Sequence, residues 1–392
     1  MTQRRTVVLA DLHLVRQTPR DVTADLARFV DAHAGARIVV AGDLFDLSSE
    51  SPSMPRPRAL REALFAHPAA RAAFAEHLER GGELWLSGGN HDAEVGAPDF
   101  PAALVEALGV SGEARARIRT TPWFFREGAI HIEHGHLYDP DNAPAHPLVV
   151  GERSLGVHFV EEFIAPTGAH RYLQANDQTP LSLFLSAFTW YGPRAPYVIY
   201  RYFHAAIGAM LKSGPLYRAR GEATVGAAVV ERFAHELGVP RAMADELLGL
   251  AATPTLESAA STFTRLYFDR VIATLSMGAG IAALGLGARE TGAAALGLGA
   301  LLMGGSWANG HNRYAGTVAE RLAESAGRVA RTTGAKLVVF GHTHKEALGD
   351  GYANTGSFSF PRAAPGRPYV EIEGPPEAPR AVSRFWTANA AA

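Results

Sequence analysis

The sequence contains no cysteine among its 392 residues. Disulfide bonds are therefore excluded, and any metal site must use oxygen and imidazole ligands because no thiolate competes with them. The lack of cysteine says little else about the compartment in which the protein works.

The chain also lacks an excess of charge of either sign. It has 37 Lys and Arg against 39 Asp and Glu, which gives a formal net charge of -2. No strongly basic domain or run is evident, so nucleic acid is not an expected partner. The sequence shows no P-loop, no Rossmann fingerprint and no acyl-transfer triad.

A long apolar leader is missing from the N-terminus as well. Residues 1–5 are followed by only a short apolar run before Asp11, which is too short for the apolar region of a secretory signal. We therefore expect this part of the chain to remain in the cytosol.

Five short polar clusters follow one another along the chain. They are Asp11-Leu12-His13, Gly42-Asp43-Leu44-Phe45-Asp46, Gly89-Asn90-His91-Asp92, His134-Gly135-His136 and Gly341-His342-Thr343-His344. A single cluster of this kind has low specificity, because such short motifs arise often by chance. The ordered set of five is far more specific.

Each cluster follows an apolar run that is typical of a buried strand. The runs are residues 6–10, 38–41, 83–86, 129–133 and 336–340. Polar residues on Gly-containing turns at strand ends are where an open α/β sheet places its site. The sequence therefore predicts an α/β fold that brings the five clusters together.

The residue types in these clusters predict metal chemistry. Asp, His and Asn supply the ligands that borderline-hard divalent metals prefer. A bridging carboxylate such as Asp43 can hold two ions ~3.5 to 4 Å apart, the spacing at which they activate a hydroxide and stabilise an in-line phosphoryl transfer. We therefore expect a two-metal hydrolase that acts on a phosphoester or pyrophosphate.

The ordered set resembles the motifs of the calcineurin-like metallophosphoesterase family, and the five blocks cover about half of the chain. The resemblance implies a sandwich of two β-sheets flanked by helices. It also implies two divalent metal ions, for which Mn, Fe and Zn are all candidates. The segment 352–357, after the last motif, resembles the closing strand and turn of the family.

Carried over residue by residue, the resemblance implies a role for each motif position. Asp11, His13, Asp43 and His344 would hold one metal, and Asp43, Asn90, His134 and His342 would hold the second. His91 would act beside the phosphoryl group as an acid or charge stabiliser, with Asp92 orienting it. Asp46 would lie behind the ligands, where carboxylates fix imidazole rings. His136 and Asp139, on the loop after His134, have two open interpretations, namely substrate contact and loop stabilisation.

A more distant resemblance is to the UDP-2,3-diacylglucosamine diphosphatases of lipid A synthesis. They share the forms of Asp11-Leu12-His13-Leu14 and of the second cluster. They commonly carry Arg at the position of His91 and Asp at the position of His136, and their helical insertion is shorter.

The length of the chain predicts two domains, and 47% hydrophobic residues are ample for their cores. Because the last motif lies near the C-terminus, residues 1–146 and 335–392 are expected to form one catalytic domain. Residues 147–334 are then an insertion, which its Ala and Leu content predicts to be mostly helical.

Two segments of the insertion are long and uncharged. Residues 271–288 contain 18 residues without a charge, and residues 291–312 contain 22, with Arg270 and Arg313 on the outside. A membrane-spanning helix needs about 20 apolar residues, within a range of ~17 to 25. The segments predict either a membrane hairpin, the favoured interpretation, or a soluble hairpin of Ala- and Gly-rich helices in a protein core.

Aromatic and basic residues are interleaved before this hairpin. They are Phe184, Phe188, Trp190, Tyr191, Tyr197, Tyr200, Tyr202, Phe203 and Tyr217, with Arg194, Arg201, Lys212, Arg218 and Arg220. Such a mixture suits the headgroup region of a bilayer, but it also suits an ordinary aromatic core with a solvated basic face.

Three classes of function remain open. The leading hypothesis is a membrane-associated metallophosphoesterase with a cytoplasmic catalytic domain and a lipid-linked phosphate or pyrophosphate as substrate. The second is a soluble phosphatase or nucleotidase whose insertion is a lid or an oligomerisation domain. The third is a non-catalytic metal-binding scaffold at the membrane, which the complete ligand set disfavours. The oligomeric state does not follow from the sequence.

Overall fold

The structure is a computed structural model that describes residues 4–50, 54–150, 153–169, 171, 180–308, 310, 317–361 and 366–387. Side chains are not described at 180–184, 218, 220 and 222–224, which include Phe184, Arg218 and Arg220 of the predicted aromatic and basic belt. Residues 309 and 311–313, at the end of the predicted hairpin, also lie outside the described residues.

The chain divides into two compact units. Unit 1 comprises Met1–Glu161, Arg218–Pro254 and Val318–Ala392, and unit 2 comprises Glu162–Tyr217 and Thr255–Thr317.

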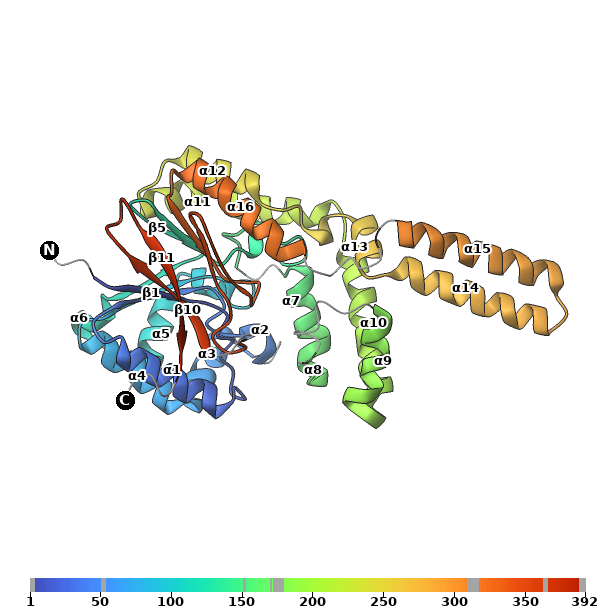
Figure 1. Ribbon diagram of the computed structural model, residues 1–392, viewed down its shortest axis with the longest axis horizontal. Coiled ribbons are helices and arrows are strands. Elements are labelled where there is room, and N and C mark those ends of the chain that lie inside the picture. The colour runs from blue at the N-terminus through green and yellow to red at the C-terminus, as the bar shows by residue number, and fades with distance from the viewer. Residues whose placement is uncertain are drawn as a thin grey trace. The chain divides into compact units, whose positions relative to one another are not determined.

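The first sheet of unit 1 has six strands in the order β11-β10-β1-β2-β3-β4 (Figure 1). The strands β1 to β4 are mutually parallel, and β10 and β11 add an antiparallel edge. Their bounds are Thr6–Leu9 for β1, Arg37–Ala41 for β2, Glu83–Ser87 for β3, Ile118–Thr121 for β4, Arg367–Glu373 for β10 and Arg380–Trp386 for β11.

The second sheet has five strands in the order β5-β6-β7-β9-β8. The central strands β6, β7 and β9 are parallel, while β5 and β8 pair antiparallel at the two edges. Their bounds are Phe124–Glu127 for β5, Ile130–Glu133 for β6, Leu337–Phe340 for β7, Glu346–Gly349 for β8 and Tyr352–Thr355 for β9.

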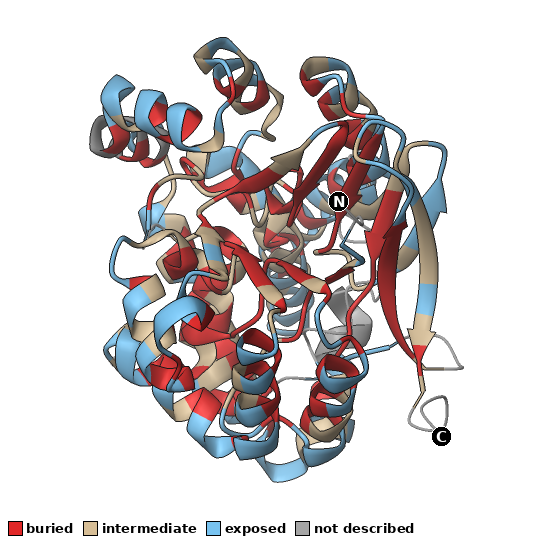
Figure 2. Cartoon of the chain, turned by 90° about the vertical axis from the view of Figure 1, so that its left-hand side faces the viewer, coloured by how far each residue is buried: buried red, intermediate tan, exposed pale blue. Residues whose placement is uncertain are grey.

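The core of unit 1 follows from the alternation of side chains along each strand. In β1, Val8 packs between the two sheets, whereas Val7 and Leu9 face the helices outside the first sheet. In β7, Val339 faces the first sheet and Val338 faces the outer helices. The central strands β1, β2, β3, β6 and β7 are therefore buried on both faces, which explains why their sequence reads as continuous apolar runs (Figure 2).

Helices cover the outer face of each sheet. The first sheet is covered by α1 (Arg20–Ala32), α3 (Arg56–Ala66), α4 (Pro68–Glu79) and α5 (Phe100–Leu108). The second is covered by α11 (Leu216–Leu237), α12 (Arg241–Leu250) and α16 (Thr317–Thr333). Unit 1 is thus an α/β structure with two mixed sheets flanked by helices. Its short elements are α2 (Leu47–Glu50), η1 (Ala93–Gly96), α6 (Gly112–Arg115), η2 (His136–Tyr138) and α7 (Leu155–Phe159).

The boundaries of the insertion differ from those expected. Residues 147–161, 218–254 and 318–334 fall within the expected insertion, but they belong to unit 1. The reason is packing: Phe233 of α11, Leu247 of α12 and Val329 of α16 complete the core outside the second sheet. The insertion predicted at 147–334 therefore contributes to both units.

Unit 2 is helical throughout its described residues. It contains the π-helical turn η3 (Val160–Ile164, which begins in unit 1), α8 (Ala165–Thr167), α9 (Pro180–Tyr191), η5 (Gly192–Arg194), α10 (Ala195–Lys212), η6 (Thr255–Glu257), α13 (Ala259–Arg265), α14 (Phe268–Gly285) and α15 (Arg289–Ala308). The helices α14 and α15 form an antiparallel hairpin (Figure 1). By length and composition alone, both are apolar enough to cross a membrane.

Candidate metal centre

The five polar clusters meet at the carboxyl ends of central strands in unit 1. Asp11 and Asp43 lie two residues beyond the neighbouring parallel strands β1 and β2. His134 directly follows β6, and His342 lies two residues beyond its parallel neighbour β7. Parallel strands bring their carboxyl ends to one edge of a sheet, which is why clusters more than 300 residues apart in sequence form one site.

The backbone at this site is unusual. Among the described residues, only six other than glycine have a positive φ, and five of them are predicted ligands. These five are Asp11, His13, Asp43, His342 and His344. A non-glycine residue in the left-handed region is uncommon, and such residues concentrate at functional sites. The strain supports the view that the loops are built to hold these side chains.

Two motif glycines are required by close approach. A Cβ on Gly42 would lie 2.5 Å from the ring of His134, and one on Gly89 would lie 2.1 Å from Oδ1 of Asp43. Any side chain at either position would displace a predicted ligand.

The four predicted ligands of the first metal lie together. The Nε2 atoms of His13 and His344 are 3.1 Å apart, and Nε2 of His344 is 3.2 Å from Oδ1 of Asp11. Nε2 of His13 is 3.8 Å from Oδ2 of Asp43. Oδ1 of Asp11 is fully buried and accepts no hydrogen bond from the described residues. A buried carboxylate oxygen without a donor, surrounded by imidazole nitrogens, fits a metal ligand.

Three of the four predicted ligands of the second metal also converge. Nε2 of His134 lies 3.2 Å from Oδ2 of Asp43 and 3.1 Å from Oδ1 of Asn90. Its Nδ1 lies 2.9 Å from the carbonyl oxygen of Ala41, a contact that orients the ring and leaves Nε2 toward the carboxylates. Asp43 therefore stands between the two sets, the place predicted for a bridging ligand.

The fourth, His342, makes a different contact. Its Nε2 lies 3.0 Å from Oδ2 of Asp139, and its ring packs edge-on against that of His134. A carboxylate only accepts, so Nε2 carries the hydrogen and the other ring nitrogen is the one left for a metal. Burial disfavours the charge of Asp139, but its hydrogen bond with His342 outweighs burial and lowers the pKa of Asp139 to about 2.

His91 is held by Asp46 rather than by Asp92, which corrects the sequence-based expectation. Nδ1 of His91 is 3.0 Å from Oδ1 of Asp46, which also accepts a hydrogen bond from Ser48. The backbone N–H of His91 donates to Asp43. Burial opposes the charged form of His91, but the carboxylates of Asp46 and Asp43 outweigh it and raise its pKa to about 10.

Asp92 instead organises the backbone of the ligand loops. Its carboxylate is fully buried and accepts hydrogen bonds from the N–H groups of Gly89, Asp43 and Phe45. It thereby ties the turn after β3 to the turn after β2. Burial and the neighbouring charge of Asp43 raise the pKa of Asp92 to about 7.

In the centre, Asp and His side chains of opposite charge offset the cost of burying one another. Burial alone would raise the pKa of Asp43, yet His134 and His91 hold it well below the ordinary value. Burial would lower the pKa of His134, yet Asp43 raises it to about 9. Three groups of Asp and His side chains have ligand atoms within 4.8 Å of one another. They are Asp11 with His13 and His344, Asp11 with Asp43 and His134, and His13 with Asp46 and His91.

His136 lies inside the centre but has a different environment from the ligands. It is buried, its Nδ1 has no hydrogen-bond partner among the described residues, and its ring lies 5.3 Å from that of His134. Burial and the neighbouring His134 hold the pKa of His136 well below its ordinary value. A neutral imidazole with a free nitrogen is available to a ligand.

The sequence analysis missed two residues at the centre. Asn142 donates to Asp139 and accepts from Asn90, so it links the two sides of the second ligand set. Its place three residues after Asp139 was the only signal. The ring of Phe360 lies 6.2 Å from the rings of His13 and His344 and is 37% exposed, which places an apolar group beside the ligands. Nothing in the sequence near Phe360 indicated this contact.

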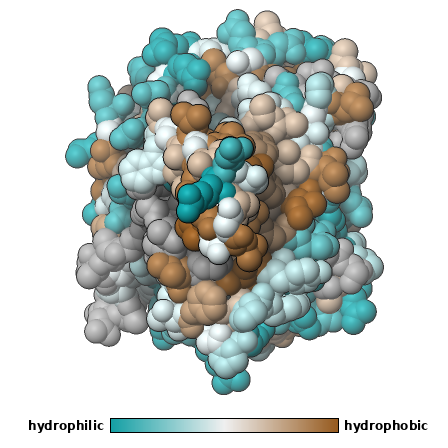
Figure 3. Space-filling model, turned by 90° about the vertical axis from the view of Figure 1, so that its right-hand side faces the viewer, coloured by the Kyte–Doolittle hydropathy of each residue, from teal (hydrophilic) through white to brown (hydrophobic). Residues whose placement is uncertain are grey.

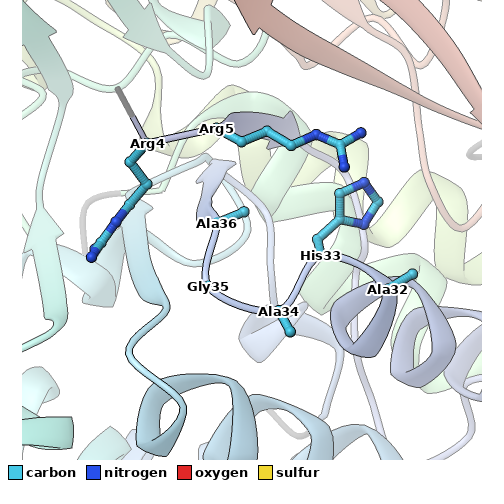
Figure 4. A pocket seen from close by; sticks show the side chains of 7 residues that line it. All are labelled: Arg4, Arg5, Ala32, His33, Ala34, Gly35 and Ala36. Carbon is cyan, nitrogen blue, oxygen red and sulfur yellow. The ribbon is translucent and has the colours of Figure 1, made fainter. Parts of the chain in front are cut away.

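A separate hollow lies beside the beginning of β1, away from the carboxyl ends of the strands (Figure 4). It is lined by Arg4, Arg5 and residues 32–36. Arg4 pairs with Glu83 and Arg5 pairs with Glu371, so neither arginine is uncompensated. The hollow contains none of the predicted site residues.

The fold and the site together define an α/β protein with a buried cluster of Asp and His side chains that could hold metal ions. No protein-family model matches the sequence, and no curated protein matches it. The family resemblance therefore rests on the five motifs and their geometry.

Proposed function

We propose that this protein is a dinuclear metal-dependent phosphoesterase that hydrolyses a phosphoester or pyrophosphate bond. The observation that carries the proposal is the position of Asp43, whose carboxylate lies beside His13 of one ligand set and His134 of the other. One carboxylate shared by two sets of ligands is the arrangement that a two-metal site needs.

The side chains of the site have distinct roles in the proposed reaction. Two divalent ions of the Mn, Fe or Zn type would supply an activated water and neutralise charge on the phosphoryl oxygens. His91, charged and held by Asp46, donates a hydrogen bond or a proton to the phosphate or to the leaving group. Asp92 fixes the loops that carry Asp43 and Asn90.

We propose a lipid-linked phosphate or pyrophosphate as the substrate, with the catalytic unit on the cytoplasmic face of a membrane. Support comes from unit 2, which carries sixteen of the twenty exposed large apolar side chains of the described residues. Soluble proteins rarely expose so much apolar surface in one region unless it meets a partner or a membrane.

The proposal is tested by removing and restoring the metals. Purified protein treated with a chelator should lose hydrolysis of an activated aryl phosphodiester and regain it with Mn²⁺ or another divalent ion. Full activity in a preparation shown to be free of metal would exclude the mechanism.

Two variants separate metal binding from chemistry. Asp43→Ala removes the shared ligand and should lower the content of both metals. His91→Ala should leave metal content near that of the wild type while lowering turnover by about 10² to 10⁴, the usual effect of a positioned acid or base. Loss of metal in proportion to activity in His91→Ala would contradict its assigned role.

A further inference from the structure

The hairpin of α14 and α15 approaches the length of a bilayer. The helices contain 18 and 20 residues, and their uncharged parts, residues 271–285 and 291–308, span about 23 and 27 Å at 1.5 Å per residue. The hydrocarbon core of a bilayer is about 30 Å thick. Between Arg270 and Arg289, and from Thr291 to Ala308, the hairpin has no charged residue.

Many large apolar side chains of the hairpin are exposed. Only 11% of the apolar window in α14 and 17% of that in α15 is buried, so neither is the core helix of a globular unit. The exposed side chains lie on both helices and along their length: Ile272, Leu275, Ile281, Leu284, Leu286, Leu298, Leu301, Leu302 and Trp307. Figure 3 shows the end of this hairpin, with hydrophobic surface around a hydrophilic tip.

Glycines let the two helices approach closely, and the side chains of Leu296, Leu284 and Met277 pack against Gly280, Gly292 and Gly299 in the seam. A Cβ on Gly280 would lie 2.9 Å from the carbonyl oxygen of Gly292, and one on Gly299 would lie 2.8 Å from that of Ala273. Such close backbone contact is how helices associate where no hydrophobic effect drives them together. The seam is therefore already occupied by the partner helix, and the exposed apolar side chains outside it are left for another environment.

Polar groups inside the hairpin are satisfied within it. The hydroxyl of Ser276 donates to the carbonyl of Ala295 across the seam, and that of Thr274 donates to the carbonyl of Arg270. A helix pair with satisfied backbone and side-chain groups meets the main requirement for residence in hydrocarbon.

The charges of the hairpin lie at its two ends. At the base, Arg270 donates to Ser306 and to the carbonyl of Gly310 and lies over the ring of Tyr267. At the tip, Arg289 and Glu290 are exposed. A helix that lies flat in the interface needs a charged face along its length. Charge confined to the ends instead suits helices that cross.

We infer that α14 and α15 cross a lipid bilayer as a closed pair, with the tip at 286–290 on the face opposite the base. The inference rests on the membrane location in the proposed function and adds the topology. With the base on the cytoplasmic face, the tip is on the other side, and a lipid-linked substrate lies in the same membrane as the anchor.

The absence of cysteine permits a direct test by single-cysteine labelling in the full chain. We choose Ala288→Cys at the tip, Ala279→Cys in the exposed middle of α14, and Ala69→Cys on the exposed surface of α4 in unit 1. All three replace an exposed alanine, so they are matched. Sealed, inside-out membrane vesicles from expressing bacteria are treated with a membrane-impermeant maleimide before and after they are opened. A parallel portion is washed with carbonate to remove protein that is only attached to the surface.

The inferred topology predicts three different outcomes. Cysteine at 69 is labelled in sealed vesicles, cysteine at 288 is labelled only after opening, and cysteine at 279 is labelled only after detergent solubilisation. Labelling of 288 in sealed vesicles would show a hairpin that lies on the surface. Failure to label 288 even after opening would show a buried tip, as in self-association. Absence of the protein from washed vesicles would also overturn the inference.

Failure of this inference is separable from failure of the proposed function. Each variant is also assayed in detergent for metal-dependent hydrolysis of an aryl phosphodiester, which needs only the centre in unit 1. A soluble protein with that activity would refute the topology and leave the phosphoesterase in place.

Discussion

At the scale of single residues, the site is maintained by a balance between backbone strain and hydrogen bonding. A residue in a sparsely populated backbone region costs on the order of 1 to 3 kcal/mol, and five predicted ligands share this condition. The loops after β1 and β2 offset this cost because the N–H groups of Leu12 and His13 both donate to the carbonyl of Asp43. The carboxylate of Asp92 adds three more backbone bonds.

The partner of His342 is the residue whose role the structure clarifies most. Asp139 orients the ring of His342. It also accepts a hydrogen bond from Asn142, which in turn accepts one from the side chain of Asn90. Residues that orient a metal ligand in this way typically change metal affinity by about 10- to 100-fold when mutated.

We predict that Asp139→Ala weakens binding of one of the two metals by about 10- to 100-fold and leaves the other nearly unchanged. The reason is that only His342 loses its orienting carboxylate. Equilibrium dialysis with Mn²⁺, followed by elemental analysis, measures both sites. Asp350→Ala, on the exposed turn between β8 and β9, is the control and should bind as the wild type does. Two sites of unaltered affinity in Asp139→Ala would contradict the assigned role.

At the scale of elements, the helices of unit 2 are built differently from those of unit 1. In α16, the buried residues include Leu322 and Val329, as in an ordinary amphipathic helix. In α10, the buried residues are mostly alanine, while Tyr197, Tyr200 and Leu211 are exposed. A helix that buries small residues and exposes large apolar ones suits an apolar environment. In this distribution of side chains, α10 resembles the hairpin.

A matched pair of lysine substitutions tests this difference. Leu275, in the middle of α14, is 67% exposed, and Leu348, on β8 of unit 1, is 57% exposed. In water both changes to lysine should alter stability by no more than about 0.5 kcal/mol, since both sites are on the surface. In a bilayer, lysine at mid-helix costs about 2.5 to 3.5 kcal/mol.

We therefore predict that Leu275→Lys lowers the membrane-bound fraction after carbonate washing, whereas Leu348→Lys leaves it unchanged. Thermal unfolding in detergent checks that both variants fold. Equal partitioning of the two variants would argue that α14 meets no hydrocarbon.

At the scale of the whole molecule, unit 1 is assembled from distant parts of the chain. Strand β6 pairs with β7 some 200 residues later, and β1 pairs with β10 near the C-terminus. Every predicted ligand lies in unit 1, while the hairpin lies in unit 2. The proposed metal binding and the proposed membrane contact are therefore assigned to different units.

This separation leads to a deletion experiment. Replacing residues 271–312 by a short Gly/Ser linker should move the protein to the soluble fraction and preserve metal content and hydrolysis of a small aryl phosphate. Turnover of a long-chain lipid phosphate in vesicles should fall, because the enzyme no longer resides where that substrate is. A deletion variant that still sediments with membranes would show that other surfaces of unit 2 carry the attachment.

The sequence by itself determined the strands that precede the five motifs, the order of the motifs and the residue types of the predicted ligands, but not β4, β5 or β8. These features are local, because strand periodicity, turn glycines and the chemistry of Asp and His can be recognised from a few neighbouring residues. The α/β architecture with the ligands at strand ends followed from them.

Only the tertiary structure decided which carboxylate holds His91, which residue holds His342, and where the insertion begins. Asp92 is adjacent to His91 in sequence, but the fold brings Asp46 to the ring from the turn after β2. The Ala- and Gly-rich helices α14 and α15 carry no clear polar face, so their sequence did not reveal which side forms the seam. Contacts between segments that are distant in sequence depend on the position of the backbone at each residue. The packing of the whole chain determines those positions, so a local sequence pattern cannot predict them.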